Sequence, residues 1–185
     1  MHSIFLPQEE VLERKAVHKA LCIGIIGEKD EQETRVPITP EGVEQLVQAG
    51  HEVRVEKNAG SGSRFTPKDF AESGAIVVDD KSELFAADYL LKVSPLDMAE
   101  IELLKGGQTL ITSLHLATRK EEYFRALIRK KTTAIAFELI QDDYGDFPVL
   151  RSMCEIAGTV SVGIGSRYLS NTDHGKGILL GGITG

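Results

Sequence analysis

Three side chains that could do chemistry lie at or beyond the ends of predicted strands. Arg35 carries a planar guanidinium that can bind a carboxylate through two parallel hydrogen bonds. Lys92 puts a point charge on an otherwise apolar strand, and His115 offers an imidazole, the side chain that most often moves protons in catalysis. Because parallel strands end at one edge of a sheet, we expect the three to meet there. Together they could grip a small oxo acid and move a proton.

Each of these residues also has a plainer structural interpretation. Arg35 can be a solvated loop arginine, and His115 can be a structural histidine. Lys92 shares one face of its strand with Ser94, so it either reaches from the sheet edge to solvent or supplies charge to a substrate. The acidic loop that begins at Glu138 is typical of a solvated turn. The convergence of the basic groups is what favours a site.

The elements that must position these residues alternate along the chain. From residue 20 onward, short apolar runs and helical segments follow one another, a pattern typical of a parallel sheet with helices on its faces. The predicted strands cover residues 21–26, 52–56, 75–78, 89–93, 109–113 and 133–137. Thr39-Pro40 and Thr66-Pro67 predict helix starts, with stops at Gly50 and Gly74, and further helices are expected over 97–105 and 119–130. The fold class is therefore α/β, a three-layer Rossmann-like parallel sheet of about six βα units.

Two other stretches flank this lobe. Residues 8–19 predict an amphipathic helix, and residues 152–169 form a long helical stretch rich in small side chains. Small residues permit close approach of another backbone, so the long helix either packs against the lobe or joins it to a second lobe. The glycine-rich tail looks like a chain cut at a linker. We expect an N-terminal helical extension at 1–19, a substrate-binding lobe at 20–150, and an interlobe helix with a glycine-rich segment at 151–185.

Composition and short motifs exclude several classes of function. The 185 residues carry a formal net charge of −7, and the dense basic run at 129–131 fits a helix C-terminus, so nucleic acid is not an expected partner. No apolar run approaches the ~18 to 20 residues that cross a bilayer, and no signal peptide is evident, so we expect a cytoplasmic protein without a membrane partner. Cys22 and Cys154 lack metal-ligand spacing, so no metal site is expected. The sequence holds neither a G-x-G-x-x-G motif nor a P-loop, so no dinucleotide-binding segment is expected in it.

Ordered motifs over residues 20–185 resemble the N-terminal, substrate-binding domain of the alanine dehydrogenase and NAD(P) transhydrogenase α subunit family. They are ETRVPITPEGV at 33–43, GHEVRVE at 50–56, AGSGS at 59–63, LKV at 91–93, LHLA at 114–117, TAIAFE at 133–138, MCEIAG at 153–158 and LGGITG at 180–185. So many motifs in one order identify the chain as a member of that family. The LHLA match favours alanine dehydrogenase over transhydrogenase, which usually lacks the histidine.

The resemblance implies a two-lobed, NAD-dependent oxidoreductase that encloses pyruvate or alanine between its lobes. It implies roles in catalysis for His115 and Lys92, in substrate binding for Arg35, Lys92 and Ser94, and in cofactor binding for Met153 and Cys154. The NAD cofactor itself would be bound mainly by the second lobe, a separate NAD-binding lobe that is absent from this chain. The full-length protein would be a homo-oligomer, and this chain alone would be inactive because hydride transfer needs the nicotinamide ring held near the substrate carbon.

One departure from the family pattern bears on the substrate. Where alanine dehydrogenases have Lys-Val-Lys-Glu-Pro, this chain has Lys92-Val93-Ser94-Pro95, one residue shorter. The family's second lysine is either replaced by Ser94 or served by Lys92 from a shifted loop. Two rival hypotheses follow: a transhydrogenase-type or saccharopine dehydrogenase-like enzyme with another substrate, or a stand-alone lobe that binds a small acid or a partner protein.

Overall fold

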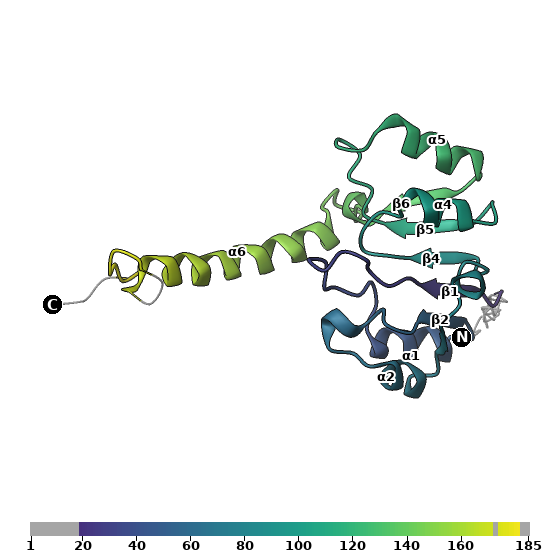
Figure 1. Cartoon of the computed structure of the whole chain (residues 1–185), viewed down its shortest axis with the longest axis horizontal. Helices are drawn as coiled ribbons and strands as arrows, with labels where there is room; N and C mark the ends of the chain where they lie inside the picture. Colours follow the sequence, from purple (N-terminus) through teal and green to yellow (C-terminus); the bar gives the residue numbers. More distant parts are fainter. Residues whose placement is uncertain (1–18, 172–173, 182–185) are drawn as a thin grey trace, which may run out of the picture.

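The computed structural model describes residues 19–171 and 174–181, which form a sheet, flanking helices and one protruding helix (Figure 1). The strands are β1 (Cys22–Ile25), β2 (Glu52–Glu56), β3 (Ile76–Val78), β4 (Tyr89–Leu91), β5 (Thr109–Thr112) and β6 (Thr133–Ala136). All six predicted strands are confirmed, and five of them are one or two residues shorter than predicted. The shortening falls mostly at the carboxyl ends, where the chain leaves the sheet.

The sheet is parallel throughout, with the strand order β3-β2-β1-β4-β5-β6. From β1 the chain proceeds outward to β3 on one side, and from β4 it proceeds outward to β6 on the other. The order therefore reverses between β1 and β4, which pair with each other. In open parallel sheets, ligands bind outside the carboxyl ends of the strands at such a reversal. The exits of β1 and β4 are the place to look for a site.

Helices cover both faces of the sheet. They are α1 (Pro40–Gln48), α2 (Pro67–Glu72), α3 (Lys81–Leu84), α4 (Met98–Leu103), α5 (Glu121–Arg129) and α6 (Pro148–Leu169), with short 3-10 turns η1 (Ser61–Ser63) and η2 (Phe137–Leu139). The last residue of β1 and the residue after it show how the core divides, because Ile25 packs with residues of α1 and α2 whereas Ile26 packs with residues of α3, α4 and α5. Both side chains are fully buried. The predicted three-layer α/β architecture is confirmed.

Side-chain caps fix the starts of the helices. The hydroxyl of Thr39 accepts a backbone N–H in the first turn of α1. Thr66 and Asp69 form a reciprocal capping box at α2, and Asp97 and Glu100 form another at α4. Both Thr-Pro helix starts predicted from the sequence are confirmed.

Two helices differ from the sequence-based expectation. No sequence pattern indicated α3, since it has only four residues, although Asp80 caps its start. The long helix α6 begins at Pro148 instead of residue 152, with the proline in its first turn as at α1 and α2. The helix predicted over residues 8–19 lies outside the described residues apart from Lys19.

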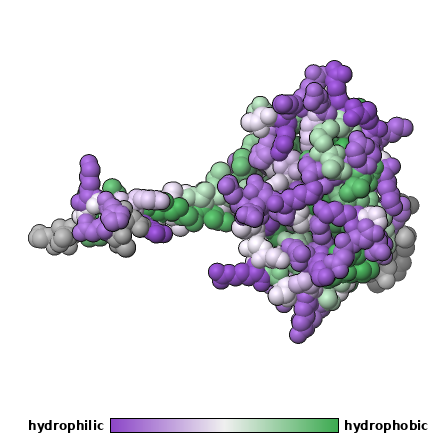
Figure 2. Space-filling view, viewed as in Figure 1, coloured by the Kyte–Doolittle hydropathy of each residue, from purple (hydrophilic) through white to green (hydrophobic). Residues whose placement is uncertain are grey.

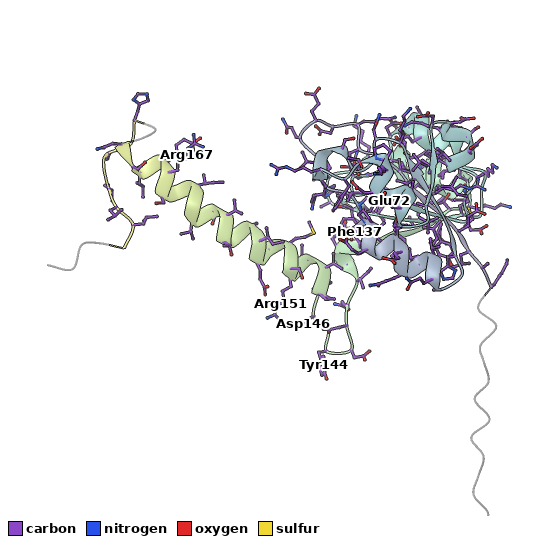
Figure 3. All side chains as sticks on the ribbon, turned by 90° about the horizontal axis from the view of Figure 1, so that it is seen from below. Glu72, Phe137, Tyr144, Asp146, Arg151 and Arg167 are labelled. Atoms are coloured by element: carbon purple, nitrogen blue, oxygen red, sulfur yellow. The ribbon has the colours of Figure 1, made fainter. Side chains whose placement is uncertain are left out.

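The helix α6 extends away from the lobe (Figure 1). None of its residues is buried, and its start contacts η2, with Phe137 at the junction in Figure 3. Hydrophobic residues gather along it in Figure 2, and Ile156, Val162 and Tyr168 each expose more than 60% of their surface. Beyond its start, α6 therefore does not pack against this lobe. Within the described part of the chain, no helix has both the length and the apolar character to cross a membrane.

Candidate functional site

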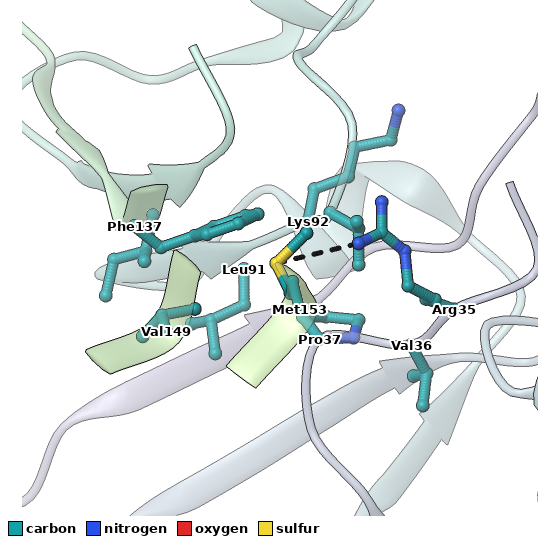
Figure 4. Close-up of a pocket in the computed structure, with 10 residues that line it drawn as sticks. Arg35, Val36, Pro37, Leu91, Lys92, Phe137, Val149 and Met153 are labelled. Carbon is teal, nitrogen blue, oxygen red and sulfur yellow. Dashed lines mark hydrogen bonds between the residues drawn. The ribbon is translucent and has the colours of Figure 1, made fainter. Parts of the chain in front are cut away.

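An apolar cavity of about 310 Å³ opens where the strand order reverses. Its walls come from the loop after β1, the exit of β4, η2 and the start of α6. In Figure 4, Arg35 and Met153 approach each other across the cavity, while Phe137 and Val149 form an apolar side. Lys92 lines the same cavity. The fold thus brings together a predicted substrate ligand, a predicted catalytic lysine and a predicted cofactor contact.

The guanidinium of Arg35 is paired with a carboxylate of its own loop. Its Nε donates to Glu33 Oε1 at 2.8 Å, and its Nη2 donates to Glu33 Oε2 at 2.5 Å. The remaining Nη1 lies 3.8 Å from Met153 Sδ, the contact dashed in Figure 4. The hydrogen bonds from Arg35 lower the pKa of the Glu33 carboxyl, and the same pairing raises the pKa of Arg35. A substrate carboxylate would have to displace Glu33 or share Arg35 with it.

Lys92 is buried, with only 3% of its surface exposed. Its Nζ lies 3.5 Å from Glu28 Oε2 and 3.5 Å from Glu100 Oε2. Glu100 is itself buried and lies 3.1 Å from the ammonium of Lys29. A buried ammonium is tolerated only when carboxylates compensate it, so these partners explain how a lysine can follow an apolar strand. The interpretation of Lys92 as a surface residue that reaches to solvent is wrong.

Glu28 also holds the backbone of the loop after β4. Its Oε1 accepts the N–H of Val93 at 2.8 Å and the N–H of Ser94 at 3.1 Å. From the other side, the hydroxyl of Thr112 donates to the carbonyl of Ser94 at 2.8 Å. The short loop is therefore anchored on both sides. The sequence placed Glu28 after the first strand, but only the fold shows what it binds.

His115 follows β5 and is exposed, with a backbone φ of 47° in the left-handed region. Few residues other than glycine adopt that region without strain, although histidine does so more often than most. The hydroxyl of Ser113 lies 3.2 Å from Nε2 and 3.4 Å from Nδ1 of the imidazole. The ring is thus oriented by a hydroxyl while it stays open to solvent.

Glu138 holds the backbone of the loop after β5. Its Oε1 accepts the N–H of Leu114 at 2.9 Å and the N–H of His115 at 3.1 Å. Its Oε2 is buried. The expectation that Glu138 belongs to a merely solvated loop is wrong, since the carboxylate reaches across to the neighbouring strand exit.

A second cavity, of about 380 Å³, lies beside His115. Lys92 and Ser94 line it, together with Arg119. Lys92 borders both cavities, whereas Arg35 lines the first cavity and not this one. One cavity therefore brings Lys92 and Ser94 together with His115, and the other brings Lys92 together with Arg35. Neither cavity holds both Arg35 and His115.

The predicted cofactor contacts differ in their surroundings. Met153 is half-buried and lines the first cavity, whereas Cys154 is a free thiol on the exposed surface of α6. Met153 and Phe137 give that cavity the apolar wall that suits a flat aromatic ring. Across residues 19–171 and 174–181, no three His, Cys, Asp or Glu side chains are grouped so that they could hold a metal ion.

Comparison with solved structures supports the same fold. An L-alanine dehydrogenase structure superimposes with a TM-score of 0.82 at 38% sequence identity, covering 88% of this chain and 45% of that one. A transhydrogenase from Sinorhizobium meliloti superimposes with a TM-score of 0.61 at 31% identity, covering 64% of this chain and 35% of that one.

Comparison of sequences gives the family. An alanine dehydrogenase of Methanococcus maripaludis is 43% identical over 166 residues, which are 89% of this chain and 44% of the relative. An alanine dehydrogenase of Staphylococcus saprophyticus is 41% identical over 165 residues, with the same coverage of 89% and 44%. The chain thus spans less than half the length of these relatives. Residues 24–157 match the family described as alanine dehydrogenase/PNT, N-terminal domain, and the chain belongs to that family.

Proposed function

We propose that this chain is the substrate-binding half of an NAD-dependent alanine dehydrogenase-like enzyme, which interconverts L-alanine with pyruvate and ammonia. The observation that carries the proposal is the gathering of Arg35, Lys92 and His115 around two cavities at the strand exits of a chain from this family. These groups supply what a small 2-oxo acid needs: a carboxylate ligand, a fixed positive charge and a proton carrier.

Arg35 and Lys92 would bind the acid. The guanidinium of Arg35 already holds the Glu33 carboxylate in a two-point pairing, which is the geometry that a substrate carboxylate would adopt. Lys92 would contribute a charge that carboxylates fix in place, and Ser94 would add a hydroxyl beside it. A positive charge held near the carbonyl oxygen stabilises the negative charge that develops there.

His115 would carry the proton. The imidazole is exposed, faces the cavity that Lys92 and Ser94 also line, and is oriented by Ser113. Ammonia adds to the carbonyl carbon to give a carbinolamine, whose hydroxyl must be protonated so that the C–O bond breaks and water leaves an imine; in the reverse direction the water that attacks the imine must be deprotonated. A positioned imidazole serves both steps, typically for a gain of about 10² to 10⁴ in rate.

NAD would be shared with residues outside these 185. Met153 and Phe137 would contact the nicotinamide, with Cys154 next to Met153 in sequence. When bound, NAD supplies the acceptor and donor of hydride. Because the sequence has no dinucleotide-binding motif, we propose that this chain alone does not catalyse the reaction.

The proposal is tested by the substrate profile of the whole gene product. NADH oxidation is followed with pyruvate and ammonia, and NAD reduction with L-alanine. We expect activity in both directions and none from the 185-residue chain alone. Absence of activity with pyruvate, in a preparation that oxidises NADH with another 2-oxo acid, would contradict the assignment of substrate.

A second candidate rests on the short loop after β4. With Ser94 where the family has a second lysine, and with Lys92 held by Glu28 and Glu100, the site offers less free positive charge than the family pattern implies. This favours a different substrate, as in a transhydrogenase-type or saccharopine dehydrogenase-like enzyme. Profiling with larger 2-oxo acids, and with NADP as hydride acceptor, separates these possibilities from alanine dehydrogenase.

We also propose that the protein acts as a homo-oligomer. The exposed apolar residues along α6, including Ile156 and Val162, are the support for this. Light scattering on this chain should show self-association that weakens in the Ile156→Asp variant. A monomer at all accessible concentrations would count against it.

A further inference from the structure

We infer that Glu138 is the positioning residue for His115: its carboxylate, set in η2, fixes the backbone that presents the imidazole to the cavity beside Lys92. The inference rests on the proposed acid/base role of His115. Glu138 lines neither cavity. It would therefore act on the site through the backbone of His115.

The contact that carries the inference is a clamp of one oxygen on two consecutive amides. Oε1 of Glu138 accepts from Leu114 N at 2.9 Å and from His115 N at 3.1 Å. Bonds from backbone N–H groups to an ionised carboxylate are stronger than bonds to a neutral acceptor. Two of them at adjacent residues fix the direction in which the chain leaves β5.

The backbone at His115 needs such a clamp. Its φ of 47° is a conformation that disfavours any residue with a Cβ atom. A residue persists there when its surroundings determine it, and such positions cluster at functional sites. Here the surroundings are Glu138 on the backbone and Ser113 on the ring, at 3.2 Å from Nε2.

The location of Glu138 connects His115 to the other cavity. Phe137, its neighbour in η2, lines the apolar cavity with Val149 and Met153 of α6 (Figure 4). The turn η2 therefore contacts α6 through Phe137 and holds the backbone of His115 through Glu138. A displacement of η2 would move both cavities together.

Another strand exit is also held by a carboxylate, which provides a control. Oε2 of Glu56 accepts the N–H of Gly27 at 2.8 Å, so the carboxylate at the end of β2 holds the exit of β1. Glu56 lies on the opposite side of the sheet order from β5. Glu56→Ala therefore removes a strand-exit carboxylate without touching His115.

The structural test is amide hydrogen exchange followed by NMR in this chain. In Glu138→Ala, exchange at Leu114 and His115 should accelerate by at least about tenfold, because a bond to a charged acceptor is lost at each. In Glu138→Gln, whose amide oxygen can still accept both bonds, acceleration should be much smaller. Glu56→Ala should leave both amides unchanged. Unchanged exchange in Glu138→Ala would overturn the inference.

The functional test is the split between kcat and KM in the whole gene product. Glu138→Ala should lower kcat by about 10- to 100-fold, because a displaced acid/base group loses its alignment, while KM for pyruvate changes little. Glu138→Gln should recover most of the loss. Altered exchange with unaltered kcat would reduce Glu138 to a structural role and overturn the inference.

Two provisions keep the test decisive. If Glu138→Ala does not fold, Glu138→Asp replaces it, since the shorter side chain keeps the charge but withdraws the oxygen from the amides. If the wild-type product shows no activity with pyruvate, the proposed function fails. The exchange result still stands in that case, and it decides whether Glu138 holds the backbone at His115.

Discussion

The neighbouring exits of β4 and β5 are held in the same way yet present their side chains differently. At each exit, one glutamate oxygen accepts two consecutive backbone N–H groups. The glutamate is Glu28 at the β4 exit and Glu138 at the β5 exit. At β4 the adjacent Lys92 is buried between carboxylates, whereas at β5 His115 is exposed and strained.

Under the proposed function, the difference separates two tasks that one site must perform. A charge that only has to be present is best fixed and desolvated, where its electrostatic effect is strongest. A group that must exchange protons has to remain accessible to substrate and solvent. The same backbone anchor serves both, and the neighbouring residues decide which task an exit performs.

The largest expected effect is at the β4 exit. Lys92→Met removes the buried cation and leaves Glu28 with an uncompensated charge, so the free energy of unfolding should fall by about 3 to 5 kcal/mol. Urea unfolding followed by circular dichroism measures it. Adding Glu28→Gln to Lys92→Met should recover part of the loss, because the amide oxygen still accepts the two N–H groups without a charge.

A surface pair supplies the control for this change. Lys57 and Asp79 lie 3.0 Å apart with side chains 53% and 73% exposed, and Lys57→Met should cost no more than about 1 kcal/mol. If Lys92→Met lowers the free energy of unfolding by no more than Lys57→Met does, Lys92 is not a fixed, buried charge. The contrast between the β4 exit and the open group at β5 would then be contradicted.

A smaller effect is expected at the β5 exit. Glycine adopts a positive φ without a Cβ clash, so His115→Gly should be more stable than His115→Ala by about 0.5 to 1 kcal/mol. Both variants lack the imidazole, so the difference reports the backbone alone. Thermal unfolding of the two variants side by side measures it, and equal stability would show that the left-handed backbone at His115 stores no strain.

The smallest effect is expected for the ion pair of Glu33 with Arg35, which is exposed whereas the ion pairs of Lys92 are buried. Glu33→Gln should lower stability at pH 7 by no more than about 1 kcal/mol, since the Arg35 side chain is 50% exposed. Arg35 lowers the pKa of Glu33 in the folded protein. The contribution of this ion pair to stability is therefore complete above the ordinary Glu pKa of 4.5, and it is lost as the pH falls through the lower pKa of the folded state. Urea unfolding at pH 7 and at progressively lower pH should show the difference between wild type and variant shrink as the pH falls; a difference that grows in acid would contradict the pairing.

What the sequence predicted well depends on neighbours along the chain. Thr39 and Thr66 each predict a helix because the capping hydroxyl and the backbone N–H that donates to it lie within one turn. The six strands follow from short apolar runs, and only their ends were misplaced. The start of α6 at Pro148 was missed although it follows the same proline rule as α1 and α2.

The details of the site depend on residues far apart in sequence. Glu28 and Val93 are 65 residues apart, and Glu138 and Leu114 are 24 apart, so neither clamp has a local signal. The burial of Lys92 likewise requires Glu100 from α4. By contrast, the pairing of Glu33 with Arg35 joins residues two apart in one loop, and an acidic residue at that spacing was a signal open to sequence reasoning.

The central claim, that the β5 exit supplies the proton carrier of a 2-oxo acid site, is tested most directly by one rate. The kcat for pyruvate- and ammonia-dependent NADH oxidation by the whole gene product is compared between wild type and His115→Ala. We predict a fall of about 10² to 10⁴ with the fold intact, as expected for loss of a general acid/base. A His115→Ala variant that turns over within about threefold of wild type, a small fraction of that range, would contradict the account.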